Sequence, residues 1–218
     1  MTPQGPILVI NPNSSTGVTQ GLVAALAPYA LPGGPAFECI DIPTSPATIA
    51  TSEDVARSGL ALAEIARGRP DASAFIIACF SDPGLELLRS LVPQPVLGIQ
   101  EAGILTAMAR ADRFGIIALS ERSVARHLLR IRQMGVLDRM AGEVGLSGVS
   151  ALDAGTCDKV LTETLEAGRG LVRQGAGAIV LGCAGFAPRR RRIEAELGVP
   201  VIDPVQAAAV IALGAVIA

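Results

Sequence analysis

The chain has 218 residues, of which half are hydrophobic and 3% aromatic, and its formal net charge is −2. This length fits one large or two small domains with an aliphatic core, and the near-balanced charge gives no indication of a nucleic-acid partner. The apolar stretch 205–218 is too short to span a bilayer, and the N-terminus lacks the basic region of a signal peptide. We therefore expect a cytoplasmic protein without a membrane partner.

Short apolar runs alternate with helical patterns along the whole chain. Runs of this length, bounded by turn residues, are typical of strands buried on both faces of a parallel sheet. Strands are predicted at 7–10, 37–42, 74–79, 95–99, 114–119, 143–149, 178–183 and 199–202. A first helix, after the turn at 11–16, carries Val18, Leu22, Val23 and Leu26 on one side. Further helices are predicted from about 53 to 67, near 85–91, at 101–111, from a cap at 120–123 to about 134, at 156–174, at 193–197 and, after the last strand, up to 218. Strict alternation of strands and helices predicts an α/β fold with parallel sheets and right-handed crossovers.

One pattern occurs twice. Residues 74–78 form an apolar run that leads into Cys79, and residues 178–182 form a similar run that leads into Cys183, 104 residues later. A second match, Pro95-Val96-Leu97 with Pro200-Val201-Ile202, has an offset of 105 residues. We therefore expect two similar Rossmann-like βα halves, each with a four-stranded parallel sheet. A pseudo-two-fold axis between the halves would place the active site, and the two cysteines, in the cleft between them.

Each repeated cysteine is predicted at the carboxyl end of a strand, where open α/β sheets bind ligands. A helix start follows, and its free N–H groups favour a thiolate. The ordinary pKa of a cysteine, about 8.5, makes both thiol and thiolate accessible near neutrality. Cys79 and Cys183 thus predict a site with two thiols that act as acid and base. For Cys39, inside a strand, and Cys157, beside a predicted helix start, we favour the alternative of a buried structural cysteine.

Several stretches resemble the hydantoin racemases of the Asp/Glu/hydantoin racemase superfamily. They are Ile10-Asn11-Pro12-Asn13-Ser14-Ser15, Cys79-Phe80-Ser81-Asp82-Pro83-Gly84-Leu85, Gly98-Ile99-Gln100-Glu101-Ala102, Leu181-Gly182-Cys183-Ala184-Gly185 and Val199-Pro200-Val201-Ile202-Asp203. The resemblance implies a racemase that needs no cofactor and uses two catalytic cysteines. It also implies that the last helix returns to the first domain, which gives domains of residues 1–98 plus 204–218 and of residues 99–203.

Candidate substrate contacts follow from the turns beside the cysteines. Phe80, Ser81, Ala184 and Gly185 offer backbone N–H groups that could stabilise the negative charge formed on a carbonyl when the α-proton leaves. Ordinary turn structure is the alternative role for each. Asn13, after the first strand, is expected either at the cleft or as a helix N-cap. Ser120 stands in this chain, after Leu119, where members of the family often carry threonine.

We expect a racemase of 5-monosubstituted hydantoins, with allantoin as a special case, that acts on a small molecule as a homo-oligomer. Three other enzyme activities of the superfamily are alternatives: maleate cis-trans isomerisation, amino-acid racemisation, and arylmalonate-type decarboxylation, although such decarboxylases keep only the second cysteine. A free amino acid is disfavoured as substrate because polar side chains do not follow the cysteines. A non-catalytic binding protein is a further alternative.

No metal site or cofactor is expected. The chain lacks a CxxC pair, a Cys/His cluster and a GxGxxG phosphate loop after the first strand. Its single histidine, His127, is expected to be solvated on a helix. The run Arg189-Arg190-Arg191-Arg192 is expected to form a solvated helix face, with a subunit contact or an attraction for anionic substrates as the alternative.

Overall fold

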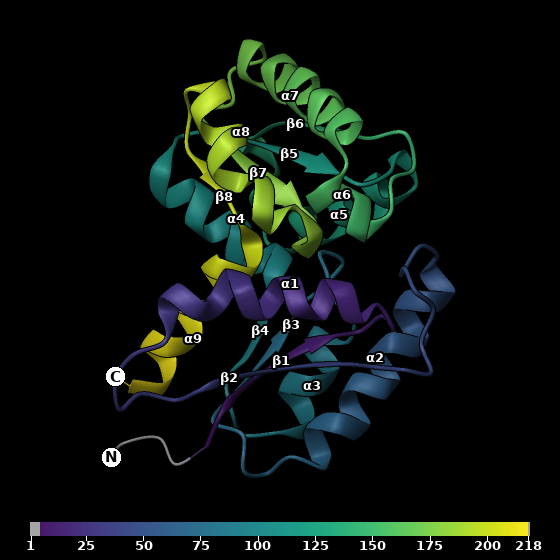
Figure 1. The fold of residues 1–218 in the computed structure, drawn as a ribbon, viewed down its shortest axis with the longest axis vertical. Helices are drawn as coiled ribbons and strands as arrows, with labels where there is room; N and C mark the ends of the chain where they lie inside the picture. Colours follow the sequence, from purple (N-terminus) through teal and green to yellow (C-terminus); the bar gives the residue numbers. More distant parts are fainter. Residues whose placement is uncertain (1–4, 218) are drawn as a thin grey trace.

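A computed structural model describes residues 5–217. Within this range the strands form two four-stranded parallel sheets with the orders β2-β1-β3-β4 and β6-β5-β7-β8. Figure 1 shows the first sheet in the lower half of the molecule and the second in the upper half. The strands are β1 (Ile7–Asn11), β2 (Phe37–Asp41), β3 (Ala74–Ile77), β4 (Val96–Gly98), β5 (Phe114–Ala118), β6 (Met140–Gly145), β7 (Ala178–Gly182) and β8 (Val201–Ile202). The predicted α/β fold with two similar sheets is confirmed.

Helices connect and cover these strands. They are α1 (Thr16–Leu26), α2 (Ser52–Arg67), α3 (Leu85–Leu91), α4 (Ile99–Arg110), α5 (Glu121–Gln133), α6 (Ala151–Thr156), α7 (Asp158–Arg173), α8 (Arg190–Leu197) and α9 (Pro204–Ile217). Short 3-10 helices occur at η1 (Ala27–Tyr29), η2 (Leu137–Arg139) and η3 (Ala184–Arg189). None of the helices described in residues 5–217 is long and apolar enough to cross a membrane.

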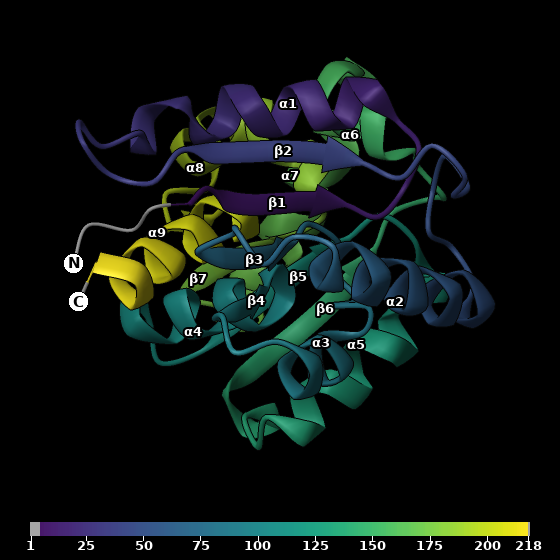
Figure 2. The same cartoon turned by 90° about the horizontal axis from the view of Figure 1, so that it is seen from below.

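Alternate residues of each strand point to opposite faces of its sheet. In β1, Ile7 and Val9 join one buried cluster, while Leu8 and Ile10 join another. The first cluster also contains Ile116 of β5 and residues of α1, α4 and α9, so it joins the inner faces of both sheets. Figure 2 shows β1 between β2 and β3 in the first sheet. This strand pattern explains why the runs are apolar throughout: both faces are covered.

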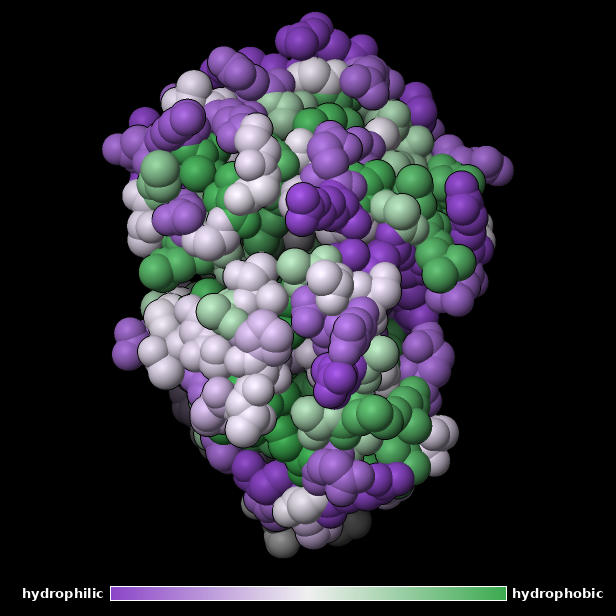
Figure 3. All heavy atoms as spheres, turned by 90° about the vertical axis from the view of Figure 1, so that its right-hand side faces the viewer, coloured by the Kyte–Doolittle hydropathy of each residue, from purple (hydrophilic) through white to green (hydrophobic). Residues whose placement is uncertain are grey.

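The last helix, α9, follows the second sheet in sequence but packs on α1, α4, β3 and β4. In Figure 1 it lies in the lower half, beside α1, and Figure 2 shows it next to α4. Figure 3 shows two lobes that meet at a waist, with hydrophilic side chains and smaller apolar patches on both. The division into domains of residues 1–98 plus 204–218 and of 99–203 stays a prediction. Residues 1–4 and Ala218, which belong to the first of these domains, lie outside the described residues.

Some predicted boundaries in the second half are wrong. β6 begins at Met140, which pairs with Phe114, and ends at Gly145, because a turn at Ser147-Gly148 follows, where Gly148 has φ of 79°. The helix predicted at 156–174 corresponds to α7 (Asp158–Arg173), and α6 (Ala151–Thr156) precedes it where no helix was predicted. The helix predicted at 193–197 begins earlier, at Arg190. Ser150 caps α6 through its Oγ, and the chain becomes extended at Cys157 before α7 begins.

Candidate active site

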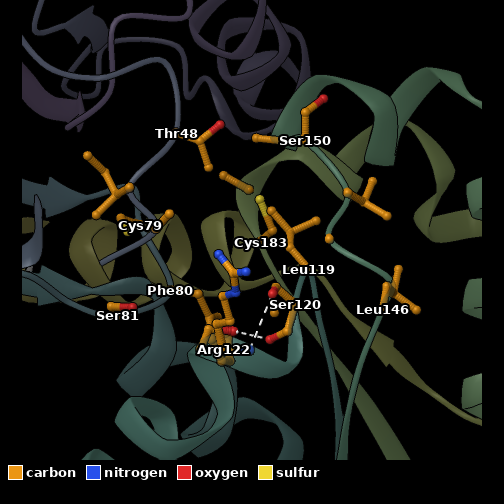
Figure 4. A pocket seen from close by; sticks show the side chains of 18 of the residues that line it. Thr48, Cys79, Phe80, Ser81, Leu119, Ser120, Arg122, Leu146, Ser150 and Cys183 are labelled. Atoms are coloured by element: carbon orange, nitrogen blue, oxygen red, sulfur yellow. Dashed lines mark hydrogen bonds between the residues drawn. The ribbon is translucent and has the colours of Figure 1, made fainter. Parts of the chain in front are cut away.

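A cavity of about 680 Å³ opens between the two sheets, beyond the carboxyl ends of β3 and β7. Cys79 enters it from the first half and Cys183 from the second, and both side chains are half-buried. Figure 4 shows Cys79 and Cys183 lining this pocket, with Phe80 and Ser81 on the chain that follows Cys79. The structure thus brings together the two cysteines that the repeat singled out.

The two thiols have similar backbone surroundings. The backbone N–H of Gly185 donates a hydrogen bond to the sulfur of Cys183 over 3.3 Å, and the N–H of Ser81 lowers the pKa of Cys79. In both turns the donor is the second residue after the cysteine. Both N–H groups therefore act on a sulfur, and a contact of Ser81 or Gly185 with a substrate carbonyl stays a prediction. Hydrogen bonds of this kind stabilise a thiolate.

Burial dominates the acidity of both thiols. It raises the pKa of Cys79 to about 11 and that of Cys183 to about 12, while the N–H groups of Ser81 and Gly185 lower both. The charge of Cys79 further raises the pKa of Cys183, so the two groups titrate as an interacting pair. The expectation that their surroundings favour a thiolate in the free protein is wrong, because desolvation outweighs the turn N–H groups.

Asp82 fixes the turn after Cys79. Its buried carboxylate accepts hydrogen bonds from the N–H groups of Gln100 at 2.9 Å and Glu101 at 3.0 Å, in the first turn of α4. A Cβ at position 98 would lie 2.3 Å from this carboxylate, so only glycine fits there. Asp82 itself has φ of 42°, a left-handed conformation that aspartate tolerates. The contact ties the turn after Cys79 to the start of α4.

Gly185 follows Cys183 at a close crossing of two backbones. A Cβ at this position would lie 1.9 Å from the carbonyl oxygen of Ala151 in α6. Ala184 lines the cavity, whereas the N–H of Gly185 is directed to the sulfur of Cys183. The small side chain at position 185 therefore lets η3 pack on α6.

Asn13 lies at the cavity and is 8% exposed. Its Oδ1 accepts from the backbone N–H of Ser15 at 2.8 Å and from Asn11 Nδ2 at 2.9 Å, so its own amide NH₂ is the group left to donate. The N-cap of α1 is Ser15, so the alternative of an N-cap role for Asn13 is wrong. Ser120 also lines the cavity and caps α5, its Oγ accepting from Arg122 N–H at 3.3 Å.

Three residues of α5 also belong to the site, although the sequence carries no motif that points to them. Arg122, Arg126 and His127 all line the cavity. The expectation that His127 is solvated is wrong: it is 2% exposed, and its Nδ1 lies 2.5 Å from the buried carboxylate of Glu143 on β6. Its ring also meets Phe80 edge to face, with centroids 5.0 Å apart. His127 and Phe80 therefore pack together behind the part of the cavity wall formed by the residues after Cys79.

Known proteins with similar sequence and structure identify the family. The sequence profile of the family described as Asp/Glu/hydantoin racemase matches residues 7–212. The chain belongs to this family. It is 38% identical to a hydantoin racemase of Paenarthrobacter aurescens, over 93% of this chain and 87% of the relative. It is 36% identical to a hydantoin racemase of Rhizobium meliloti, over 93% and 85% of the two chains.

A solved structure of an allantoin racemase from Klebsiella pneumoniae superposes with a TM-score of 0.88 and 32% sequence identity, and the match covers 95% of this chain and 85% of that one. The family resemblance inferred from the motifs is therefore confirmed. All three relatives carry racemase names, and racemases are isomerases, which is the enzyme class expected from the sequence.

The other two cysteines, Cys39 and Cys157, do not line the cavity. Cys39 lies on β2, where it pairs in register with Val9 and packs on the inner core. Cys157 lies between α6 and α7 and packs on the core of the second sheet. Neither thiol is among the residues that line the cavity. Their placement is consistent with the structural role favoured for both.

The arginine run is solvated only in part. Arg189 donates to the carbonyl oxygens of Gly155 and Thr156 and pairs with Asp158 at 3.0 Å, so it ties η3 to the end of α6. Arg190 pairs with Glu194. Only Arg191 and Arg192 are exposed. The expected solvated face is therefore wrong for the first half of the run, because the carbonyl groups at the end of α6 bind Arg189.

Among residues 5–217, no group of three His, Cys, Asp or Glu side chains is arranged to hold a metal ion. The absence of a metal and of an organic cofactor from the reaction stays a prediction.

Proposed function

We propose that this chain is a racemase of 5-monosubstituted hydantoins or related cyclic ureides, that it needs no cofactor, and that Cys79 and Cys183 exchange the proton. One observation carries the proposal: two thiols from two different sheets face one cavity in a member of this family. The names of the relatives, hydantoin racemase and allantoin racemase, support this substrate class. The cytoplasmic location and the homo-oligomeric state stay predictions.

The reaction requires a base on one face of carbon 5 and an acid on the other. One cysteine, as thiolate, removes the proton from carbon 5 and becomes a thiol. The electron pair of the broken C–H bond moves onto the adjacent ring carbonyl. The opposite cysteine then gives its proton to the other face of carbon 5 and becomes the thiolate. The two thiols carry one proton between them at the start and at the end, and each direction uses them in opposite roles.

Donors for the charged carbonyl oxygen lie beside both cysteines. Within residues 5–217, the backbone N–H groups of Phe80 and Ala184 donate no hydrogen bond to another protein group. Both residues line the cavity, as does Asn13 with its NH₂ group. Donors fixed before the reaction stabilise developing negative charge without a cost of reorientation. We assign the contact with the carbonyl oxygen to these three groups. Ser81 and Gly185 act on the sulfurs, and Ser120 lines the opposite wall of the cavity.

The test of this function is a polarimetric assay over a set of single-enantiomer 5-substituted hydantoins, with allantoin included, in the presence of a chelator. Loss of rotation with no change in composition is expected, because racemisation alters only configuration. Release of CO₂ from an arylmalonate, isomerisation of maleate, or racemisation of glutamate or aspartate in place of hydantoins would contradict the proposal. Activity that disappears on chelation and returns with one metal would contradict the thiol mechanism.

The rate should rise with pH across neutrality. Because burial raises the pKa values of Cys79 and Cys183 to about 11 and about 12, the reactive thiolate is a minor species at pH 7. Each unit of pH multiplies its population, and hence kcat/KM, by about ten until the first pKa is approached. We expect this slope between pH 6 and 8, after subtraction of the uncatalysed rate. A kcat/KM that is flat over that interval would show that the thiolate is already the main form.

A further inference from the structure

Two arginines of α5 line the cavity without a carboxylate partner. Among the described residues, no acidic group lies within 4.0 Å of the guanidinium of Arg122 or Arg126. Arg130, one turn further along the same helix, shows the usual alternative, since it pairs with both Glu86 and Glu101. Arg122 and Arg126 are spaced by four residues, so they share one face of α5.

Arg126 is the more confined of the two. Its Nε is buried and has no hydrogen-bond partner, and its Nη1 donates to the carbonyl oxygen of Arg122 at 3.2 Å. Buried polar groups in folded proteins are normally paired, and a buried N–H of a cation without an acceptor is costly. An acceptor supplied by a bound molecule would remove that cost. The guanidinium of arginine is a planar donor that fits a carboxylate with two parallel hydrogen bonds.

The other charges around this end of the cavity do not neutralise the two arginines. Glu121 lines the cavity but is exposed and forms no ion pair with either. Asp54 of α2 feels the charge of Arg126, but its carboxylate already accepts from the N–H groups of Ala50 and Thr51. The carboxylate of Glu143 is held by His127. An excess of positive charge therefore remains on the cavity wall formed by α5.

This wall lies close to the thiols. The charge of Arg126 lowers the pKa of Cys79. Figure 4 places Arg122 together with Phe80 and Ser120 toward one end of the cavity, away from Thr48 and Ser150 at the other end. A group attached to carbon 5 of a ring held between Cys79 and Cys183 would need only a short linker to meet the arginines.

Building on the racemase function proposed above, we propose that Arg122 and Arg126 bind a carboxylate on the substituent at carbon 5. The preferred substrates are then hydantoins with a short acidic side chain, which are anionic at neutral pH. The ring remains neutral and reacts between the thiols, while the arginines select the substituent.

The experiment compares hydantoin-5-acetic acid with hydantoin-5-acetamide, which has nearly the same shape but no charge. Racemisation of single enantiomers of both is followed by polarimetry at pH 7 in the wild type, Arg122→Gln, Arg126→Gln and Arg132→Gln. Arg132 is a matched control, because it lies exposed on the same helix and outside the cavity lining. Allantoin, whose neutral ureido group offers a carbonyl acceptor, is a third substrate. Binding of the acid and the amide is measured separately by calorimetry.

We expect the wild type to prefer the acid over the amide by about tenfold or more in kcat/KM, the size of a charge-assisted hydrogen bond. Arg126→Gln and Arg122→Gln should each reduce the ratio of acid to amide, and Arg132→Gln should leave it unchanged. The ratio is the informative quantity, because any effect of Arg126 on the acidity of Cys79 alters both substrates equally. Equal use of acid and amide, or a preference for the amide or for allantoin, would overturn the inference and leave the racemase function standing.

Calorimetry separates the two proposals if no hydantoin is racemised. Tighter binding of the acid than of the amide, lost in Arg126→Gln, would then support the carboxylate site and contradict the racemase function. Equal binding of the two compounds would contradict both.

Discussion

Replacing either Cys79 or Cys183 with serine should lower kcat/KM for hydantoin racemisation by about 10²–10⁴-fold, the range that general acid–base groups contribute. The loss should be equal in both directions, since every turnover needs one group to remove the proton and the other to supply one. Serine keeps the shape of cysteine and the position of its acceptor atom, but its hydroxyl does not ionise usefully near neutrality. Initial rates of loss and gain of optical rotation, from each enantiomer, measure the effect.

Cys157→Ser is the matched control for these two variants. Cys157 is half-buried like Cys79 and Cys183 but lies outside the cavity lining. It should therefore retain the wild-type rate. A Cys79→Ser or Cys183→Ser variant that keeps full racemisation would show that a single thiol is sufficient and would remove the basis of the two-thiol mechanism.

Gly185→Ala should damage both stability and activity although it adds one methyl group. The new Cβ would lie 1.9 Å from the carbonyl oxygen of Ala151, so η3 or α6 must move. Overpacking of this kind costs about 1–3 kcal/mol of stability. Because the N–H of Gly185 also contacts the sulfur of Cys183, a shift of the backbone displaces the thiol, and a displacement of about 1 Å can cost about 10²-fold in rate. Urea unfolding and kcat/KM measure the two effects.

Gly214→Ala provides the comparison. Gly214 is exposed in the interior of α9, and a Cβ there meets no atom within 4 Å. The substitution should raise stability by about 0.5–1 kcal/mol, as alanine favours a helix over glycine, and leave kcat/KM unchanged. A Gly185→Ala variant with the urea midpoint and the kcat/KM of the wild type would contradict this prediction. It would show that the close crossing of η3 and α6 does not control the position of the Cys183 thiol.

The sheets and the position of the two cysteines could be predicted from the sequence because both depend on short-range patterns. A strand buried on both faces is a continuous apolar run, and Ile7 to Ile10 divide between two buried clusters as the pleat requires. The residue after such a run lies at the edge of the sheet where ligands bind, and that placed Cys79 and Cys183 at the cavity. The same rule misplaced β6, because Leu146 and Val149 prolong its apolar pattern beyond the turn at Gly148.

The face of α5 that lines the cavity could not be predicted in this way. Charged residues occur all along the helix, and which of them turn inward depends on how the helix lies against β6 and the loop after β3. His127 is buried because Glu143 reaches it from β6, and Phe80 packs on its ring. Both partners are distant in sequence from the histidine. The pKa values of the thiols could not be predicted for the same reason, since their desolvation arises from the closed fold rather than from the neighbouring residues.

Exchange of the proton on carbon 5 with solvent, followed by NMR in D₂O for each enantiomer with each serine variant, tests the central claim most directly. One thiol can remove a proton and return deuterium to the same face, so exchange needs only one working cysteine. If Cys79 and Cys183 lie on opposite faces of carbon 5, Cys79→Ser should exchange one enantiomer with retention and Cys183→Ser the opposite one. Exchange of the same enantiomer by both variants would contradict the arrangement of opposed thiols.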